Sequence, residues 1–143
     1  MSLRAIGTRH PATATPGATV SQIARQLEDR NVGSILVVRD GKPVGILTDR
    51  DLVLRIMRKG LDPGGVRAEE IMSRPVVVAP DEMLPIEAAA RMRENRIRRL
   101  PIVDGEGRLV GILTLDDLVH HIGRTSGELS EAVATFPQPY EGG

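Results

Sequence analysis

A threonine followed three residues later by an aspartate occurs twice in this 143-residue chain, each time directly after Gly-Ile-Leu. The two pairs are Thr48 with Asp51 and Thr114 with Asp117. One interpretation is structural, because such a pair forms a capping box at the start of a helix. The other is chemical, because a hydroxyl and a carboxylate beside free backbone N–H groups can bind ribose hydroxyls, and a helix start favours phosphate. The spacing leaves both interpretations open.

Basic residues are concentrated in the second half of the chain. Five arginines lie within nine residues: Arg91, Arg93, Arg96, Arg98 and Arg99. We expect the first three on a solvated helix face. Arg98 and Arg99 precede a short apolar run, and the guanidinium fork matches phosphate oxygens, so at least one of them is predicted to bind phosphate. The first half has Gly33 and Ser34 at these two positions, so Asp117 is predicted to favour phosphorylated ligands more than Asp51 does.

No residue pattern predicts catalysis. His120 and His121 are adjacent, so on a helix they point about 100° apart and do not form the i, i+4 pair of a metal site. Asp116 beside Asp117 suggests magnesium, but capping and ribose contact explain this pair more simply. Phosphate-binding loops, nucleophile elbows and dinucleotide fingerprints are absent from the sequence. We therefore predict no catalytic residue and no metal ligand.

The elements that must position these residues occur twice, because the chain is an internal duplication. Residues 9–16 match residues 73–80 at an offset of 64, with both prolines in register. Residues 44–53 match residues 110–119 at an offset of 66. We predict a first repeat at 6–58, a linker at 59–67, a second repeat at 68–123 and a tail at 124–143. The tail could form a short helix with Leu129, Val133 and Phe136 on one face.

Each repeat is expected to contain the same series of elements. A short extended segment (Ala12–Thr15 or Val76–Ala79) precedes an amphipathic helix. The apolar positions of that helix are Val20, Ile23, Ala24 and Leu27 in the first copy, and Ile86, Ala89 and Ala90 in the second. Two buried strands follow, Ile35–Val38 with Val44–Leu47 and Leu100–Val103 with Leu109–Leu113, and a second helix begins after each threonine.

The turns and the repeat length predict how the elements pack. Asp40-Gly41 and Asp104-Gly105 favour hairpins between the paired strands. A half of about 60 residues buries little surface alone, so the two halves are expected to pack sheet to sheet about a pseudo-two-fold axis. The predicted fold is α+β, with α/β layered β-α-β-β-α halves.

Composition disfavours several classes of partner. Nineteen basic and nineteen acidic residues cancel, so no net charge attracts nucleic acid or an anionic membrane. The chain has one Phe and one Tyr and therefore offers no stacking platform for bases. No apolar run approaches the roughly 18 residues of a membrane span, and the first residues lack the apolar core of a signal peptide. The absence of cysteine fits a cytoplasmic location.

The order strand, Asp-Gly turn, strand and Gly-Ile-Leu-Thr-x-x-Asp resembles the CBS domain, named after cystathionine β-synthase. Residues 97–104, Ile-Arg-Arg-Leu-Pro-Ile-Val-Asp, and residues 71–75, Ile-Met-Ser-Arg-Pro, are also close to that family's wording. The resemblance covers residues 6 to 122 and occurs twice, as in the tandem arrangement called a Bateman module. The first repeat departs from the family at residues 6–11, where Ile-Gly-Thr-Arg-His-Pro replaces the usual Met-containing phrase.

The resemblance implies a disc-like regulatory module whose two clefts bind AMP, ADP, ATP, S-adenosylmethionine or related ligands, with no obligatory cofactor. By position, Asp51 and Asp117 would hold ribose hydroxyls, helped by Thr48 and Thr114. Residues lying beside the base or the phosphates would be Gly33, Ser34, Arg98 and Arg99. Thr13 and Val77 would line the adenine.

The resemblance further implies a homodimer and a downstream protein that responds to the ligand. A different hypothesis is a ligand-free scaffold that dimerises or docks a partner. A third, an enzyme acting on a nucleotide, is disfavoured because nothing in the sequence is catalytic.

Overall fold

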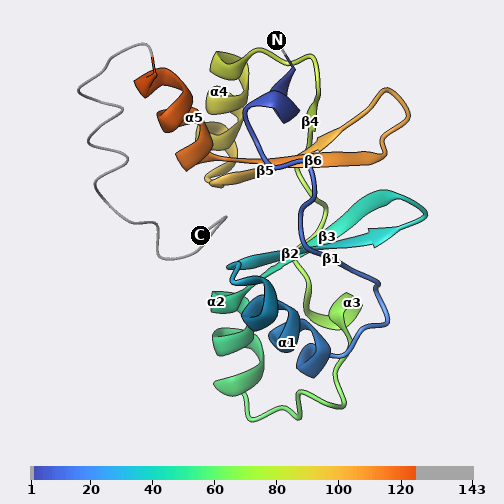
Figure 1. The fold of residues 1–143 in the computed structure, drawn as a ribbon. Coiled ribbons are helices and arrows are strands. Elements are labelled where there is room, and N and C mark those ends of the chain that lie inside the picture. The colour runs from blue at the N-terminus through green and yellow to red at the C-terminus, as the bar shows by residue number, and fades with distance from the viewer. Residues whose placement is uncertain (1, 125–143) are drawn as a thin grey trace. The chain divides into compact units, whose positions relative to one another are not determined.

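The computed structural model describes residues 2–124 and divides them into two compact units (Figure 1). The repeat-1 unit contains residues 11–76, and the repeat-2 unit contains residues 2–10 together with residues 77–124. Each unit has one three-stranded sheet and its own helices, so the α+β prediction is confirmed. The helix predicted around Leu129, Val133 and Phe136 lies outside the described residues.

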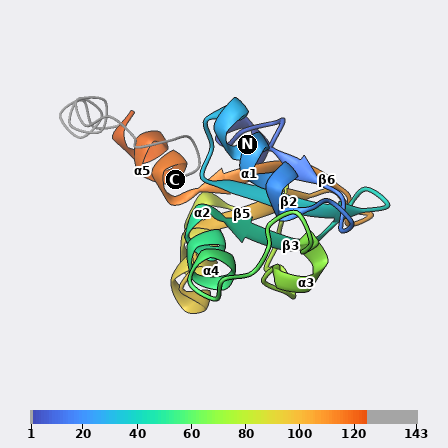
Figure 2. The same cartoon turned by 90° about the horizontal axis from the view of Figure 1, so that it is seen from below.

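In the repeat-1 unit the sheet order is β1-β2-β3. β1 is parallel to β2, and β2 is antiparallel to β3. The strands are β1 (Thr13–Ala14), β2 (Ser34–Arg39) and β3 (Lys42–Thr48). The helices are α1 (Val20–Arg30), α2 (Asp49–Leu52), which continues as the π-helical turn η2 (Val53–Met57), and α3 (Ala68–Ile71). Helices α1 and α2 pack against each other and lie against one face of this sheet (Figures 1 and 2).

The repeat-2 unit has the same topology, with the sheet order β4-β5-β6. Its strands are β4 (Ala79–Pro80), β5 (Arg99–Val103) and β6 (Leu109–Thr114). Its helices are the short 3-10 helix η1 (Leu3–Ala5), α4 (Pro85–Asn95) and α5 (Leu115–Gly123). None of the helices within residues 2–124 is long and apolar enough to cross a bilayer.

The two hairpins differ in length. Asp40 and Gly41 both have positive φ, 54° and 79°, which is the backbone of a two-residue hairpin turn whose twist matches the strands. The second turn extends from Asp104 to Arg108 and takes its positive φ at Gly107. The Asp104 carboxylate accepts hydrogen bonds from the backbone N–H groups of Glu106 and Arg108, each at 2.9 Å. The tight Asp104-Gly105 turn was therefore predicted too short.

Each unit buries its own apolar core. In the repeat-1 unit Ile23 of α1 meets Ile35 and Val37 of β2 and Leu47 of β3. The corresponding core of the repeat-2 unit contains Met92, Leu100, Ile102, Leu113 and Leu118. Burying one such aliphatic side chain stabilises the fold by about 1.5–3 kcal/mol.

One part of the predicted core is wrong. Helix α4 buries Ala88 and Met92, whereas Ile86 is 77% exposed. Successive helical residues are about 100° apart, so Ile86, two residues before Ala88, points to the opposite side of the helix. The sheet lies against the face that contains Ala88 and Met92, and Ile86 is left in solvent.

The segment that precedes each sheet in the sequence packs on the sheet of the other repeat. The N–H and C=O of Ser73 pair with those of Ile46 on β3, at 3.0 and 3.1 Å. Thr8 pairs in the same way with Ile112 on β6, both bonds being 2.9 Å. Leu3 is fully buried in the core of the repeat-2 unit. The compact units are therefore offset from the sequence repeats.

A substitution at Gly7 should destabilise the repeat-2 unit. A Cβ at this position would lie 2.3 Å from the backbone carbonyl oxygen of Ile112, which a side-chain movement cannot relieve. We expect Gly7→Ala to lower the free energy of unfolding by about 1–3 kcal/mol, the usual cost of overpacking. Urea denaturation measures this change.

Gly105→Ala is the matched control, because a Cβ at Gly105 meets nothing within 4 Å. Equal stability of the two variants would contradict the proposed packing of residues 2–10 on β6.

Candidate ligand-binding sites at two helix starts

Both Thr-x-x-Asp pairs form capping boxes. The Thr48 hydroxyl accepts a hydrogen bond from the Asp51 N–H at 3.2 Å, and the Thr48 N–H donates to Asp51 Oδ2 at 2.9 Å. The same two bonds join Thr114 and Asp117, at 3.1 and 2.8 Å. The capping interpretation of the motif is thus confirmed in both repeats. Each cap uses only one carboxylate oxygen, so it leaves the chemical interpretation open.

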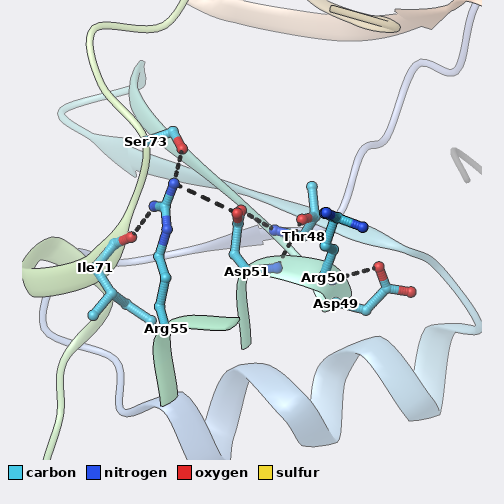
Figure 3. A network of polar contacts seen from close by, with 7 residues as sticks. All are labelled: Thr48, Asp49, Arg50, Asp51, Arg55, Ile71 and Ser73. Carbon is cyan, nitrogen blue, oxygen red and sulfur yellow. Dashed lines mark hydrogen bonds and ion pairs between the residues drawn. The ribbon is translucent and has the colours of Figure 1, made fainter. Parts of the chain in front are cut away.

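The surroundings of the two carboxylates differ. Asp51 Oδ1 lies 3.6 Å from Nη2 of Arg55, four residues further along the helix (Figure 3). The residue that corresponds to Arg55 in the second repeat is His121. Burial raises the pKa of Asp117, and the hydrogen bonds from Thr114 oppose this shift without cancelling it. The two sites therefore have the same local backbone conformation but different charged neighbours.

Two residues predicted beside the base or the phosphates, Gly33 and Ser34, adjoin the Asp51 helix start in the sheet. Ser34 is buried and stands opposite Thr48 across the β2–β3 pair. The Gly33 carbonyl accepts a hydrogen bond from the N–H of Asp49 at 3.1 Å. The start of the first strand and the start of the second helix are thus joined directly.

The repeat-2 unit brings the predicted arginines to the same place. Arg99 stands opposite Thr114, and the Arg98 carbonyl accepts from the N–H of Leu115 at 2.8 Å. The Arg98 side chain is 62% exposed, and its Nη2 lies 3.8 Å from Asp116 Oδ1. Two guanidinium groups therefore belong to residues beside the Asp117 helix start, where the repeat-1 unit has Gly33 and Ser34.

The strand register assigns the position equivalent to Thr13 to a different residue from the one predicted. Ala14 stands opposite Val37 on β2, and Ala79 stands opposite Ile102, the corresponding residue of β5. Val78, and not Val77, is therefore equivalent to Thr13. The side chain of Val77 packs against the apolar core.

The predicted offset of 64 at this strand came from aligning two prolines. Pro16 follows β1 after one intervening residue, whereas Pro80 belongs to β4 itself, so the true offset at this strand is 65. The extended segment predicted at Val76–Ala79 is correspondingly short and late, at Ala79–Pro80.

The comparisons with known proteins bear on this geometry. Residues 3–58 and 68–124 each match the family described as CBS domain. The chain belongs to the CBS domain family. It carries two CBS repeats in tandem, as the sequence resemblance implied.

Curated relatives share this tandem pair. The chain is 41% identical to the CBS domain-containing protein YhcV of Bacillus subtilis over 111 residues. The alignment covers 78% of each protein. It is 38% identical over 120 residues to an uncharacterized protein of Methanopyrus kandleri, of which it spans 61%. Inosine-5'-monophosphate dehydrogenase of Thermoplasma acidophilum is 35% identical over 107 residues, which are 75% of this chain and 21% of the enzyme.

Two solved CBS structures that resemble this chain contain ligands. The CBS domain pair of MJ0100, in complex with 5'-methylthioadenosine and S-adenosyl-L-methionine, superposes with a TM-score of 0.77 at 28% identity, over 88% of this chain and 98% of that one. The CBS domain protein PAE2072 of Pyrobaculum aerophilum, complexed with AMP, superposes with a TM-score of 0.75 at 27% identity. The match covers 95% of this chain and 100% of that one.

The two CBS repeats also differ beside their first helices. In the repeat-1 unit a groove of about 600 Å³ lies between β1 and α1, and its lining includes Thr13, Gln22 and Gln26. Gln26 Oε1 is buried, and the described residues offer it no hydrogen-bond partner. The residue equivalent to Gln26 is Arg91, which is half-buried and donates to the Val78 carbonyl at 2.7 Å. Arg91 was predicted on a solvated face, and this contact corrects that prediction.

The last turn of the second helix contains both adjacent histidines of the second CBS repeat, His120 and His121. Within residues 2–124 no group of three or more His, Asp or Glu side chains is arranged to hold a metal ion.

The raised pKa of Asp117 makes a prediction about stability and pH. A carboxyl with a raised pKa in the folded state binds its proton more tightly when folded, so its contribution to stability is lost as pH rises from 3.8 through the folded-state pKa. In urea denaturation at several pH values, wild type should therefore lose stability relative to Asp117→Asn across this window.

Asp104→Asn supplies a control of opposite sign. The backbone N–H groups of Arg108 and Glu106 lower the pKa of Asp104, so its contribution is lost as pH falls. A pH profile of Asp117→Asn that runs parallel to that of wild type would contradict the assignment of a raised pKa to Asp117.

Proposed function

We propose that this tandem CBS pair is a regulatory module that binds an adenosyl ligand, AMP, ADP, ATP or S-adenosylmethionine, at the Asp51 and Asp117 helix starts. The observation that carries the proposal is the repeated cap, in which each carboxylate uses Oδ2 for the threonine N–H. The second oxygen, Oδ1, is then the acceptor for a ribose hydroxyl. The adenosyl ligands of the MJ0100 and PAE2072 structures support this choice of ligand class.

The phosphate preference of the two sites follows from their charges. Arg99 begins β5 opposite Thr114, and Arg98 directly precedes it, so both residues adjoin the Asp117 helix start. A guanidinium fork binds phosphate oxygens through two hydrogen bonds. Gly33 and Ser34 supply no charge at the Asp51 site. AMP, ADP and ATP are therefore assigned to the Asp117 site first, and a ligand without phosphate suits the Asp51 site.

Thr13 and Val78 are the proposed residues beside the adenine. Thr13 is exposed and stands opposite Leu36, two residues along β2 from Ser34. Val78 takes this place in the repeat-2 unit through its register, and it replaces Val77 in the proposal. The face-to-face packing of the two sheets, with the clefts that it would form, stays a prediction of the family resemblance.

The proposed output is a conformational change that an unidentified downstream protein reads, and the ligand is a regulator and not a cofactor of a reaction. A ligand shifts such an equilibrium only by its difference in affinity between the two states. Stabilisation by a ligand at 100 times its Kd amounts to about 2.7 kcal/mol, which thermal unfolding detects.

Asn substitutions test the two sites. Asp51→Asn and Asp117→Asn each keep an oxygen for the cap and remove a charged acceptor, so the fold should persist. A hydrogen bond to a charged group contributes about 1.5–3 kcal/mol, so each change should weaken its own site about tenfold or more. Isothermal titration calorimetry with AMP and with S-adenosylmethionine measures both affinities.

Asp117→Asn should reduce AMP affinity more than Asp51→Asn does. Asp62→Asn, in the segment between the repeats, is the control and should bind like wild type. Full affinity in both site variants would refute ribose binding by these acids, and equal losses of AMP affinity would refute the preference for the Asp117 site.

A dimerising scaffold is the second candidate function, and exposed apolar residues favour it. A five-residue stretch of the repeat-1 unit contains three exposed apolar side chains. They are Val53, Leu54 and Met57, which are 48%, 41% and 73% exposed. Apolar side chains gathered on one helical turn are characteristic of a surface that packs on another protein. We propose a second copy of this chain as the occupant, which also provides a homodimer for the sensor.

Met57→Glu should weaken this dimer, because it places a charge in the apolar surface. Light scattering after size exclusion should give twice the mass of one chain for wild type and a lower value for the variant. Lys59→Glu, an exposed neighbouring change, should leave the mass unaltered. A monomeric wild type would remove the homodimer proposal.

A further inference from the structure

Arg55 contacts three parts of the repeat-1 unit at once (Figure 3). Its Nη1 donates a hydrogen bond to the carbonyl of Ile71, and its Nη2 donates to Ser73 Oγ at 3.0 Å. The same Nη2 lies 3.6 Å from Asp51 Oδ1. The guanidinium thus joins the acid of the candidate ligand site to residues 71–73, from which the chain continues into the repeat-2 unit.

The distances assign different roles to the three contacts. The hydrogen bonds of the guanidinium go to Ile71 and Ser73, whereas 3.6 Å to Asp51 is an ion pair that is too long for a hydrogen bond. Asp51 Oδ1 is therefore held in place by charge and still has lone pairs to accept a ligand hydroxyl. The Asp51 side chain is 18% exposed and that of Arg55 38%, so water screens this pair less than a surface pair.

Ser73 is fixed to the sheet by more than its hydroxyl. Its N–H donates to the carbonyl of Ile46 and its C=O accepts from the N–H of Ile46, which pairs Ser73 with the edge strand β3. Gly45 lets this segment approach, because a Cβ there would lie 2.1 Å from the sulfur of Met72. Arg55 therefore contacts a segment, residues 71–73, that is itself hydrogen-bonded to the edge strand β3.

The second repeat keeps the segment and lacks the bridge. Thr8 pairs with Ile112 as Ser73 pairs with Ile46, but the position of Arg55 is occupied by His121. The helix also differs, because η2 is a π-helical turn, in which the Arg58 N–H donates to the Val53 carbonyl, whereas α5 is a regular α-helix. Such π-helical turns are frequent at functional sites.

We propose that Arg55 is a positioning residue of the Asp51 site, which couples ligand binding there to the anchorage of residues 71–73 on β3. A ligand hydroxyl on Asp51 fixes the carboxylate, the carboxylate fixes Arg55, and Arg55 holds Ile71 and Ser73. Coupling of this kind is reciprocal, so a firmly anchored Ser73 must equally raise the affinity of the site. The inference rests on the proposed function for the ligand and on the side-chain contacts of Arg55 for the bridge (Figure 3).

The test measures amide hydrogen exchange by NMR in the full chain without ligand, with AMP and, separately, with S-adenosylmethionine, which carries no phosphate. The Asp51 amide reports occupancy of this site, and the Ser73 and Ile46 amides report the anchorage. In wild type, saturating AMP should slow exchange at Ser73 and Ile46 by about fivefold or more, the range of typical couplings. In Arg55→Gln that slowing should vanish, and AMP affinity at the Asp51 amide should fall by a similar factor.

Two controls separate the bridge from a general loss of charge. Arg58→Gln removes an exposed positive charge from the same helix and should behave like wild type. The Thr8 and Ile112 amides, which form the equivalent pair in the repeat-2 unit, should respond to AMP alike in wild type and Arg55→Gln. Wild-type slowing and wild-type affinity in Arg55→Gln would overturn the proposal.

A second variant covers failure of Arg55→Gln to fold. Ser73→Ala removes only the hydroxyl and keeps the backbone bonds to Ile46, and it should lose most of the AMP-induced slowing. If it keeps all of the slowing, the proposal is overturned.

Failure of the proposed function gives a different result. If neither AMP nor S-adenosylmethionine shifts the Asp51 amide of wild type, ligand binding at this site is refuted, and the bridge is tested without ligand. Asp51→Asn alone should then speed amide exchange at Ser73. Added to Arg55→Gln, the same substitution should have no further effect. Full additivity of the two substitutions would overturn the coupling.

Discussion

The cap between a threonine and the aspartate three residues later is the interaction on which both sites depend. In each CBS repeat the strand ends at the threonine and the helix begins at the next residue. No loop separates the two elements, so the sheet itself fixes the position of the carboxylate. The same bonds satisfy the free amides of the helix start and hold the acid in one rotamer. A ligand that binds there meets a preorganised acceptor and does not have to order it.

Duplication has preserved this cap and changed the charges around it. The two cores use corresponding aliphatic residues, whereas the positions beside the caps hold Gly33 and Ser34 in one repeat and Arg98 and Arg99 in the other. Arg55 pairs with Asp51, and the equivalent residue beside Asp117 is His121. Burial raises the pKa of Asp117. One scaffold thus presents two acids with different electrostatic surroundings, and the proposed difference in ligand preference depends on that difference.

The segments that precede the two sheets, around Leu3 and around Ala68, make the two CBS repeats depend on each other. Leu3 is buried in the core of the repeat-2 unit, and Ala68 is buried in the core of the repeat-1 unit. Each compact unit is therefore completed by residues that belong to the other sequence repeat. Neither repeat alone contains all the residues of one core. A change in how residues 71–73 attach to β3 would consequently act on the chain that joins the two compact units.

The sequence by itself determined the duplication, the four strands of the two hairpins and helix α1, and it offered both caps as one interpretation of the motif. These features depend on contacts between residues a few positions apart or on simple alternation. It assigned Val77 instead of Val78 to the position equivalent to Thr13, and it was wrong about the exposure of Ile86, the contact of Arg91 and the length of the second turn. It also could not reveal that Thr8 meets Ile112 or that Arg55 meets Ser73. Those pairs bring together residues far apart in the sequence, and only the path of the folded chain decides which side chains meet. Residue spacing predicts local hydrogen bonds, whereas tertiary packing decides which residues pair across a sheet edge.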